Sequence, residues 1–248
     1  MLKFTTITVC FNEAETIERT IKSVLAQGYQ NTEYLIIDGG SRDGTVELAK
    51  KYTGSRVTLI SEKDNGIYDA MNKALNLATG DILYFLNADD YFYDDNVLSL
   101  AAKCLEDDQA IDILSGKIEF FNTPVINGKH YQRENFLFRN KLELYRNPNG
   151  QQCVFSRKSL FDKIGNFNLS YPLCADYEWL IRAINNNANI SFVDSYFSNV
   201  DYQGVSYTSN TQRLREKRKI ILLNSSLREI FLFIVLGLKQ KIGNLLHR

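Results

Sequence analysis

The sequence predicts an α/β fold in which a mostly parallel central sheet carries helices on both faces. Short apolar segments that suit buried strands alternate with longer segments that suit helices in the first third of the chain. Helical crossovers between strands favour parallel pairing with right-handed connections. The chain has 248 residues, 44% of them hydrophobic, so it is long enough for one large domain with a substantial core.

The alternation of strands and helices is clearest before residue 90. The run that starts at Phe4 is apolar and β-branched, which suits a buried strand. Ile67, Met71, Leu75 and Ala78 share one face of a later helix, and they form the core stripe that a crossover helix needs. The expected strands are residues 4–10, 34–38, 57–61 and 81–87, and the expected helices are residues 13–27, 43–52 and 66–78.

The pattern is looser beyond residue 96. Residues 111–121 and 152–155 suit strands, and residues 175–186 suit a helix. Residues 122–150 are polar, aromatic and irregular. The sequence shows no repeat or low-complexity run, and it has only three prolines, which argues against a disordered linker. We therefore expect one domain of residues 1–210, followed by a helical tail of residues 211–248.

Charge is divided unevenly between these two parts although the net charge is zero. Residues 211–248 hold nine basic and two acidic residues, a net +7, which leaves −7 for residues 1–210. An acidic body does not favour nucleic acid as a partner. A basic tail with an apolar run at residues 230–236, too short to span a bilayer, favours an anionic membrane surface. The alternative is an ordinary helix docked on the domain with its basic face in water.

The N-terminal segment and the cysteines both favour a cytoplasmic protein. The first residues lead straight into a strand pattern, without the charged region, long apolar stretch or cleavage site of a secretory signal. The four cysteines are far apart and form no CxxC pair, so reduced thiols are expected rather than disulfides or zinc ligands. Together with the basic tail, this predicts a cytoplasmic protein that is peripheral on the cytoplasmic face of the inner membrane.

The most informative segment is residues 83–90, Leu-Tyr-Phe-Leu-Asn-Ala-Asp-Asp, where an apolar strand ends on clustered acids. Open α/β sheets present ligand-binding groups at the carboxyl ends of their strands, so Asp89 and Asp90 are expected at a crevice. Burying adjacent carboxylates is costly unless a cation offsets their charge. Magnesium or manganese holding a diphosphate suits these hard oxygen ligands. A turn that caps the next helix is the alternative.

Two further segments place acids after expected strands. Residues 35–45 combine a strand that ends on Asp38 with glycines that allow a close approach to a ligand, and then a capped helix start. They lack the P-loop and GxGxxG spacings, so spacing alone favours a structural turn. Residues 61–72 place Asp64 between a strand and a helix. We expect Asp38, Asp64 and Asp89 to converge on one crevice, which a purely structural role does not predict.

At these residues the chain resembles the family 2 glycosyltransferases. Residues 7–14 are similar to the opening strand of the family, and residues 38–45 to its Asp-Gly-Ser-x-Asp-Gly-Thr turn. Residues 87–90 resemble its metal-binding DXD motif, and residues 174–179, Cys-Ala-Asp-Tyr-Glu-Trp, resemble the motif that supplies the catalytic base. The resemblance implies a GT-A fold, a nucleotide-sugar donor, Mn²⁺ or Mg²⁺ as cofactor, and inversion at the anomeric carbon.

The resemblance also implies roles for single residues. Asp176 is the expected base, at the start of a helix whose dipole favours the ionised carboxylate; without the resemblance, a helix N-cap would be favoured. Asp89 is expected to coordinate the metal, with Asp90 as a further or alternative ligand. The residues expected to bind the nucleotide sugar are Thr8, Phe11, Glu13, Asp38, Asp64, Asn87 and Ala88, and those expected near the acceptor are Tyr177 and Trp179. Core packing is the alternative for both aromatic side chains.

The chain departs from the commoner family pattern in two places. Asn87 replaces the first acid of the DXD motif, which removes one charge from the expected metal site. Gly39 stands where a second acid often follows Asp38. The Gln-x-x-Arg-Trp motif of processive synthases is missing, because Gln212 is followed by Arg-Leu-Arg-Glu. We therefore expect one sugar to be added per encounter.

The sequence thus predicts an inverting, metal-dependent, non-processive transferase that moves one hexose, glucose or galactose, from a UDP-sugar. The resemblance is strongest to bacterial enzymes of O-antigen and surface polysaccharide biosynthesis, which favours N-acetylglucosamine-diphospho-undecaprenol as the lipid-linked acceptor. The alternatives are a polyprenyl-phosphate sugar synthase and a nucleotide-sugar-binding protein without turnover. A nucleotidyltransferase is disfavoured because Glu13 follows the first strand, where a basic glycine-rich loop would be needed.

Overall fold

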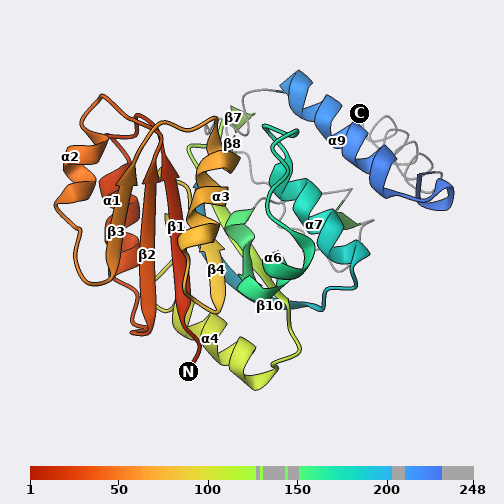
Figure 1. The fold of residues 1–248 in the computed structure, drawn as a ribbon, viewed down its shortest axis with the longest axis horizontal. Coiled ribbons are helices and arrows are strands. Elements are labelled where there is room, and N and C mark those ends of the chain that lie inside the picture. Colours follow the sequence, from red (N-terminus) through yellow and green to blue (C-terminus); the bar gives the residue numbers. More distant parts are fainter. Residues whose placement is uncertain (127–128, 131–142, 145–150, 203–209, 231–248) are drawn as a thin grey trace.

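The computed structural model describes residues 1–126, 129–130, 143–144, 151–202 and 210–230, and it has one large mixed sheet at its centre (Figure 1). The strands are ordered β3-β2-β1-β4-β9-β6-β10-β5 across this sheet. A two-stranded sheet pairs β7 (Val125–Ile126) with β8 (Lys129–His130). The strands of the large sheet are β1 (Phe4–Cys10), β2 (Thr32–Asp38), β3 (Val57–Ser61), β4 (Ile82–Phe85), β5 (Tyr91–Phe92), β6 (Ile113–Phe121), β9 (Val154–Arg157) and β10 (Ile190–Asp201).

Most strands of the large sheet run in one direction. β1 pairs in parallel with both β2 and β4, β2 with β3, and β6 with β10. β9 is antiparallel to β4 and β6, and β5 is antiparallel to β10. The carboxyl ends of β1, β3, β4 and β10 therefore lie at the same edge of the sheet, where such folds bind their ligands.

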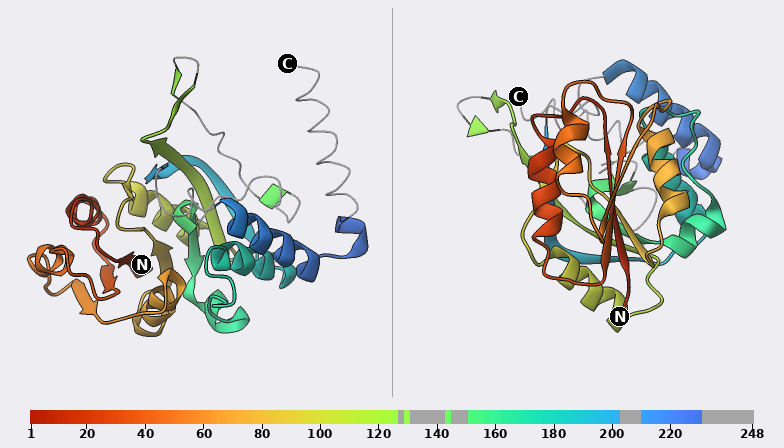
Figure 2. Two further views of the ribbon diagram at one scale, coloured as in Figure 1. Left: turned by 90° about the horizontal axis from the view of Figure 1, so that it is seen from above. Right: turned by 60° about the vertical axis from the view of Figure 1, so that its left-hand side comes forward.

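Helices cover both faces of the sheet, and Figure 2 shows α1 and α3 on opposite sides of it. One face carries α1 (Ile17–Leu25), α2 (Thr45–Lys50) and α4 (Val97–Asp107). The other carries α3 (Ile67–Leu77), α6 (Lys158–Ile164), α7 (Ala175–Asn185) and α9 (Asn210–Asn224). Each face has its own apolar core. Successive side chains of β1 point to opposite faces, so Ile7 and Val9 join one core while Phe4 and Cys10 join the other.

The predicted fold class is confirmed, and several predicted elements match closely. β1 and β3 begin and end at the predicted residues, and α7 ends one residue before the prediction. One member of the predicted core stripe on α3 is wrong. Ile67 is 39% exposed, whereas the adjacent Tyr68 is buried. Ile67, the first residue of α3, lines a cavity instead of packing against the sheet with the rest of the stripe.

The start of the basic tail packs on the body of the protein. α9 lies along α7, and its Ile220 is fully buried in the core shared with α7. The apolar run at residues 230–236 falls almost entirely outside the described residues. Within the described part of the chain, no helix is long and apolar enough to cross a membrane. All four cysteines lie in described segments, and none of them forms a disulfide.

Candidate active site

A cavity of about 380 Å³ opens at the edge of the sheet where the parallel strands end. Its walls come from six segments of the chain. They are the end of β1, the start of α3 with the loop before it, the loop of residues 87–90 after β4, Gln152 just before β9, the loop before α7 that contains Pro172 and Leu173, and the end of β10. Parallel pairing brings the strand ends together, so the location follows from the sheet topology.

The loop of residues 87–90 is held by α1. The hydroxyl of Thr20 donates to the carbonyl oxygens of Ala88 and Asp90, at 2.8 and 2.6 Å. Arg19 donates to the carbonyl oxygen of Asp89 at 2.7 Å, and its guanidinium stacks on the ring of Tyr91 at 4.7 Å. The sequence left open whether this loop caps the next helix. It does not, because α4 begins at Val97, several residues downstream.

Asp89 presents a carboxylate to the cavity in surroundings that favour a cation. Burial raises its pKa above the ordinary range, and the charge of Asp201 raises it further, while Arg19 acts in the opposite direction. A divalent ion beside Asp89 would offset this unfavourable charge. Among the described residues, no three His, Cys, Asp or Glu side chains are grouped so as to hold a metal by themselves. A metal here would therefore need further oxygen ligands, such as diphosphate or water.

Asp90 has a different environment from Asp89. It is 1% exposed, and its Oδ1 accepts a hydrogen bond from the backbone N–H of Asp201 at 3.0 Å. Its Oδ2 is buried without a hydrogen-bond partner, and burial, together with the charge of Asp89, holds its pKa well above the usual range. Asp90 thus joins the loop after β4 to the end of β10. This arrangement fits a residue that supports the metal site better than one that binds the metal directly.

Asp201 is a cavity residue that the sequence analysis missed. It is the last residue of β10, and it lines the cavity together with Asp89 and Glu13. Its side chain accepts a hydrogen bond from Asn122 at 2.9 Å. β10 itself was not predicted, because its sequence mixes polar and apolar residues without clean alternation. The available signal was an acid at the end of a segment rich in β-branched and aromatic residues.

The side of the cavity near β1 contains three predicted donor-binding residues. Phe11 is 59% exposed and lines the cavity with Glu13 and Asp64. Burial raises the pKa of Glu13. Gly39 lies behind this wall, and a Cβ there would come within 2.5 Å of Asp64 Oδ2. A side chain at residue 39 would therefore require the Asp64 carboxylate to move.

Two other predicted donor-binding residues do not line the cavity. Asp38 is fully buried, and its carboxylate accepts hydrogen bonds from the backbone N–H groups of Gly40 and Ser41, both at 3.0 Å, and from Ser61 Oγ at 2.7 Å. Thr8 is also fully buried, and its hydroxyl accepts from Tyr34 at 2.9 Å. The expected convergence of three acids is thus correct for Asp64 and Asp89 but not for Asp38, whose carboxylate holds the loop after β2.

Asp176 lies in the first turn of α7 and is bonded to the cavity wall. Its Oδ1 accepts a hydrogen bond from the hydroxyl of Tyr68 at 2.7 Å, and Tyr68 lines the cavity. The N-cap of α7 is Cys174, and no side chain caps that end of the helix. The N-cap alternative for Asp176 is therefore wrong. Its carboxylate is directed toward α3 instead.

The two aromatic residues expected near the acceptor are buried. Trp179 is 0% exposed, stacks on Phe161 with 4.0 Å between ring centroids, and donates from Nε1 to the carbonyl of Gly165 at 3.0 Å. Tyr177 is 3% exposed beneath the ammonium of Lys217. Stacking on a sugar requires an accessible ring face, so these two predictions are corrected: both side chains belong to the core.

Comparison with known proteins identifies the family. The family model described as Glycosyl transferase family 2 matches residues 5–165. A PGL/p-HBAD biosynthesis glycosyltransferase of Mycobacterium bovis (strain BCG / Pasteur 1173P2) is 30% identical over 191 residues, which are 76% of this chain and 72% of the relative. A glycosyltransferase of Mycobacterium tuberculosis (strain ATCC 25618 / H37Rv), described as uncharacterized, is 34% identical over 179 residues, which are 71% and 67% of the two chains.

Solved structures share the fold. Staphylococcus aureus TarS superposes with a TM-score of 0.71 at 21% identity, over 93% of this chain and 41% of the TarS chain. The mannosyltransferase PcManGT of Pyrobaculum calidifontis, in complex with GDP-Man and Mn²⁺, superposes with a TM-score of 0.67 at 18% identity, over 91% and 65%. This likeness agrees with the GT-A fold that the sequence implied. Together with the family match, it shows that this chain belongs to glycosyl transferase family 2 and is a glycosyltransferase.

Proposed function

We propose that this chain is an inverting, metal-dependent, non-processive hexosyltransferase that uses a UDP-sugar, with glucose or galactose favoured. The observation that carries the proposal is the distribution of acids around one cavity. Asp89 and Asp201 line the cavity, and Asp176, which is not itself a lining residue, accepts a hydrogen bond from the lining residue Tyr68. Inverting transfer needs a cation on one side of the anomeric carbon and a proton acceptor on the other.

The donor would bind on the side of β1 and β4. TarS was solved with UDP-GlcNAc and PcManGT with GDP-Man and Mn²⁺, which supports a nucleotide-sugar donor for a chain of the same fold. Phe11, Glu13 and Asp64 would contact the nucleoside, while Asn87 and Ala88 would face the ribose and diphosphate. Asp89 would hold Mn²⁺ or Mg²⁺, and Asp90 would fix the loop that carries Asp89 through its hydrogen bond with the N–H of Asp201. The metal would stabilise the charge that develops on the departing diphosphate.

Asp176 would act as the base. The acceptor hydroxyl oxygen forms a bond to the anomeric carbon while the bond to the diphosphate breaks, and the hydroxyl proton passes to a carboxylate oxygen of Asp176. The position of Asp176 in the first turn of α7 keeps the carboxylate near the positive end of the helix dipole, which favours its ionised form. A neutral residue at this position would leave the proton without an acceptor.

The acceptor is proposed to be a lipid-linked saccharide, with N-acetylglucosamine-diphospho-undecaprenol favoured. α9 carries most of the basic residues of the described tail, and it contacts the cavity wall because Glu216 accepts a hydrogen bond from the backbone N–H of Leu173 at 3.0 Å. A basic helix beside the cavity would bring an anionic membrane surface close to the acceptor side. The protein would then act on the cytoplasmic face of the inner membrane, and residues 211–248 would form a functional tail on a body of residues 1–210.

The two alternative functions make different demands on Asp176. A polyprenyl-phosphate sugar synthase uses an acceptor oxygen that is already ionised, so it needs no strong base. The hydrogen bond from Tyr68 to Asp176 favours a hydroxyl acceptor, because a carboxylate held in one orientation suits proton transfer. A binding protein without turnover would need neither residue. The neutral Asn87 is the feature that favours this second alternative.

The test is UDP release from a panel of nucleotide sugars, with and without Mn²⁺, in the presence of a synthetic N-acetylglucosamine diphosphate lipid. We expect metal-dependent release with one UDP-sugar and none after Asp176→Asn. Release with a polyprenyl phosphate alone would support the synthase alternative. Binding of UDP without release of product from any donor and acceptor pair would contradict the proposed transfer.

A further inference from the structure

A buried tyrosine joins the cavity to the proposed base. Tyr68, the second residue of α3, is 8% exposed and lines the cavity. Its hydroxyl donates to Asp176 Oδ1 at 2.7 Å, over a separation of 108 residues in the sequence. Within the described residues no hydrogen bond engages Asp176 Oδ2. The two oxygens of this carboxylate are therefore not equivalent: one is bound to α3, and the other remains available.

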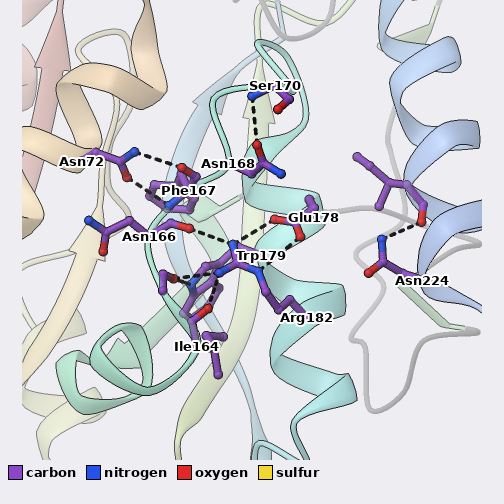
Figure 3. Close-up of polar contacts among 12 residues, drawn as sticks. Asn72, Ile164, Asn166, Phe167, Asn168, Ser170, Glu178, Trp179, Arg182 and Asn224 are labelled. Atoms are coloured by element: carbon purple, nitrogen blue, oxygen red, sulfur yellow. Dashed lines mark hydrogen bonds and ion pairs between the residues drawn. The ribbon is translucent and has the colours of Figure 1, made fainter.

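α3 is fixed by a loop that precedes α7. Asn72, one turn after Tyr68, donates from Nδ2 to the carbonyl of Phe167 and accepts at Oδ1 from the N–H of Phe167, both at 3.0 Å (Figure 3). The ring of Phe167 also packs on the ring of Tyr68, with 5.5 Å between centroids. Asn72 thus makes the same pair of bonds to the loop that a neighbouring strand would make, and this restricts how Tyr68 can move.

The same loop is fixed to α7, which carries Asp176. Arg182 donates to the carbonyl oxygens of Gly165 at 3.0 Å and Asn166 at 2.7 Å, and also to that of Ile164 (Figure 3). Its guanidinium is oriented by Glu178 through bonds of 2.9 and 3.2 Å. Residues 164–167 are therefore bonded to both helices. This sets the distance between the start of α3 and the start of α7, and so the separation of the tyrosine and the aspartate.

The geometry points to Tyr68 as a positioning residue for catalysis, which holds the Asp176 carboxylate in one rotamer so that Oδ2 faces the acceptor hydroxyl. This inference rests on the proposed role of Asp176 as base. Tyr68 is suited to the task because burial and the charge of Asp176 hold the pKa of the phenol well above its usual value. The hydroxyl therefore keeps its proton and acts only as a donor to the carboxylate.

Charged and titratable groups surround Asp176 on α7, at the residue before that helix, on α9 and on α3. Glu178 on α7 is paired with Arg182 and directed away toward the loop. The thiol of Cys174 is buried before the helix, and the charge of Asp176 contributes to raising the pKa of this thiol. The groups on α9 that act on Cys174 are Arg213, Glu216 and Lys217. Tyr68 is the residue of α3 that donates directly to the Asp176 carboxylate.

The test is Tyr68→Phe, which removes the hydroxyl but keeps the ring that packs on Phe167. Without the hydroxyl the Asp176 carboxylate is free to change rotamer, so kcat should fall about tenfold with the donor KM unchanged. The matched control is Tyr29→Phe, which removes a hydroxyl bond to Leu2 from a tyrosine that packs on Phe4, outside the cavity lining.

A second measurement does not depend on turnover. Carboxyl carbon NMR of the full chain, with the Asp176 signal assigned by its loss in Asp176→Asn, should show a changed chemical shift for that carbon in Tyr68→Phe. An unchanged chemical shift together with an unchanged kcat would overturn the inference. If the chemical shift changes but the wild type transfers no sugar, the pairing stands and the proposed transferase activity fails. Equal melting temperatures of Tyr68→Phe and Tyr29→Phe would exclude general unfolding as the cause.

Discussion

Replacing Asp89 by Asn is predicted to stabilise the metal-free protein while abolishing the stabilisation that metal and UDP provide. The change keeps the size of the side chain and removes its charge. Burial and the charge of Asp201 raise the pKa of Asp89 in the folded protein, so between the unfolded and folded pKa values the folded state binds more protons than the unfolded state does. The free energy of unfolding therefore falls as pH rises through that window, and at pH 7 the ionised Asp89 destabilises the metal-free fold.

The expected magnitude is modest without metal and larger with it. Single substitutions typically change the free energy of unfolding by about 0.5–3 kcal/mol, and removal of this buried charge should act in the stabilising direction. For a chain of this size, about 1 kcal/mol corresponds to a change in Tm of about 2–4 °C. In the wild type, Mn²⁺ with UDP at about 100 times their Kd should add about 2.7 kcal/mol. Asp89→Asn should gain little of this, because the ligand that holds the metal is missing.

The assay is thermal unfolding of both proteins at pH 7, in EDTA and in Mn²⁺ with UDP. The account predicts a reversal of order: the variant melts higher in EDTA and lower with metal and nucleotide. A variant that melts below the wild type in EDTA and gains as much from Mn²⁺ with UDP would refute the reasoning, since Asp89 would then stabilise the fold and bind no metal. Repeating the EDTA scan at lower pH should narrow the difference between the two melting temperatures, because the raised pKa of Asp89 favours proton uptake by its carboxylate in the folded wild type.

Three other predictions follow from the packing and charge of the protein. Gly39→Ala places a Cβ within 2.5 Å of Asp64 Oδ2, which must move. Calorimetry should then show UDP binding weakened about tenfold, with little change in Tm. Equal or tighter binding would contradict a role of the Asp64 position in binding UDP. Trp179→Phe loses the hydrogen bond to the Gly165 carbonyl, so urea titrations should show a free energy of unfolding lower by about 1–3 kcal/mol. The acceptor KM should not change, and a higher acceptor KM would indicate that Trp179 does contact the acceptor. Deleting residues 226–248 should weaken co-sedimentation with anionic vesicles, with neutral vesicles as control, because only the basic residues of α9 remain in the tail; unchanged binding would show that residues 226–248 are not part of the anchor.

Much of the fold could be predicted because local and long-range requirements agree in the first half of the chain. β1 and β3 are short, β-branched or apolar and end at polar turns, so their limits were evident. α4 was missed because most of its apolar residues form a nearly continuous run rather than a clear periodic stripe. β9 was expected, but its antiparallel direction was not, since direction depends on how the chain returns to the sheet.

The candidate site was predicted in part for similar reasons. Acids at strand ends converge when the strands are parallel, and this placed Asp89 and Asp64 correctly at the cavity. Asp38 is at an equivalent strand end, but its neighbours Gly40 and Ser41 offer N–H groups that hold its carboxylate in the loop. Asp201 required knowledge of strand order, because β10 is placed at the site by its pairing with β6 and β5. Local sequence cannot show such pairings.

The central claim is that transfer needs Asp176 as a base while donor binding does not. The most direct measurement compares Asp176→Asn with the wild type, using the donor found in the UDP-sugar panel, and determines the rate of transfer and the Kd for UDP in Mn²⁺ on the same preparations. The account predicts that transfer falls about a thousandfold and that the Kd is unchanged. Transfer by Asp176→Asn at a rate close to that of the wild type would contradict it.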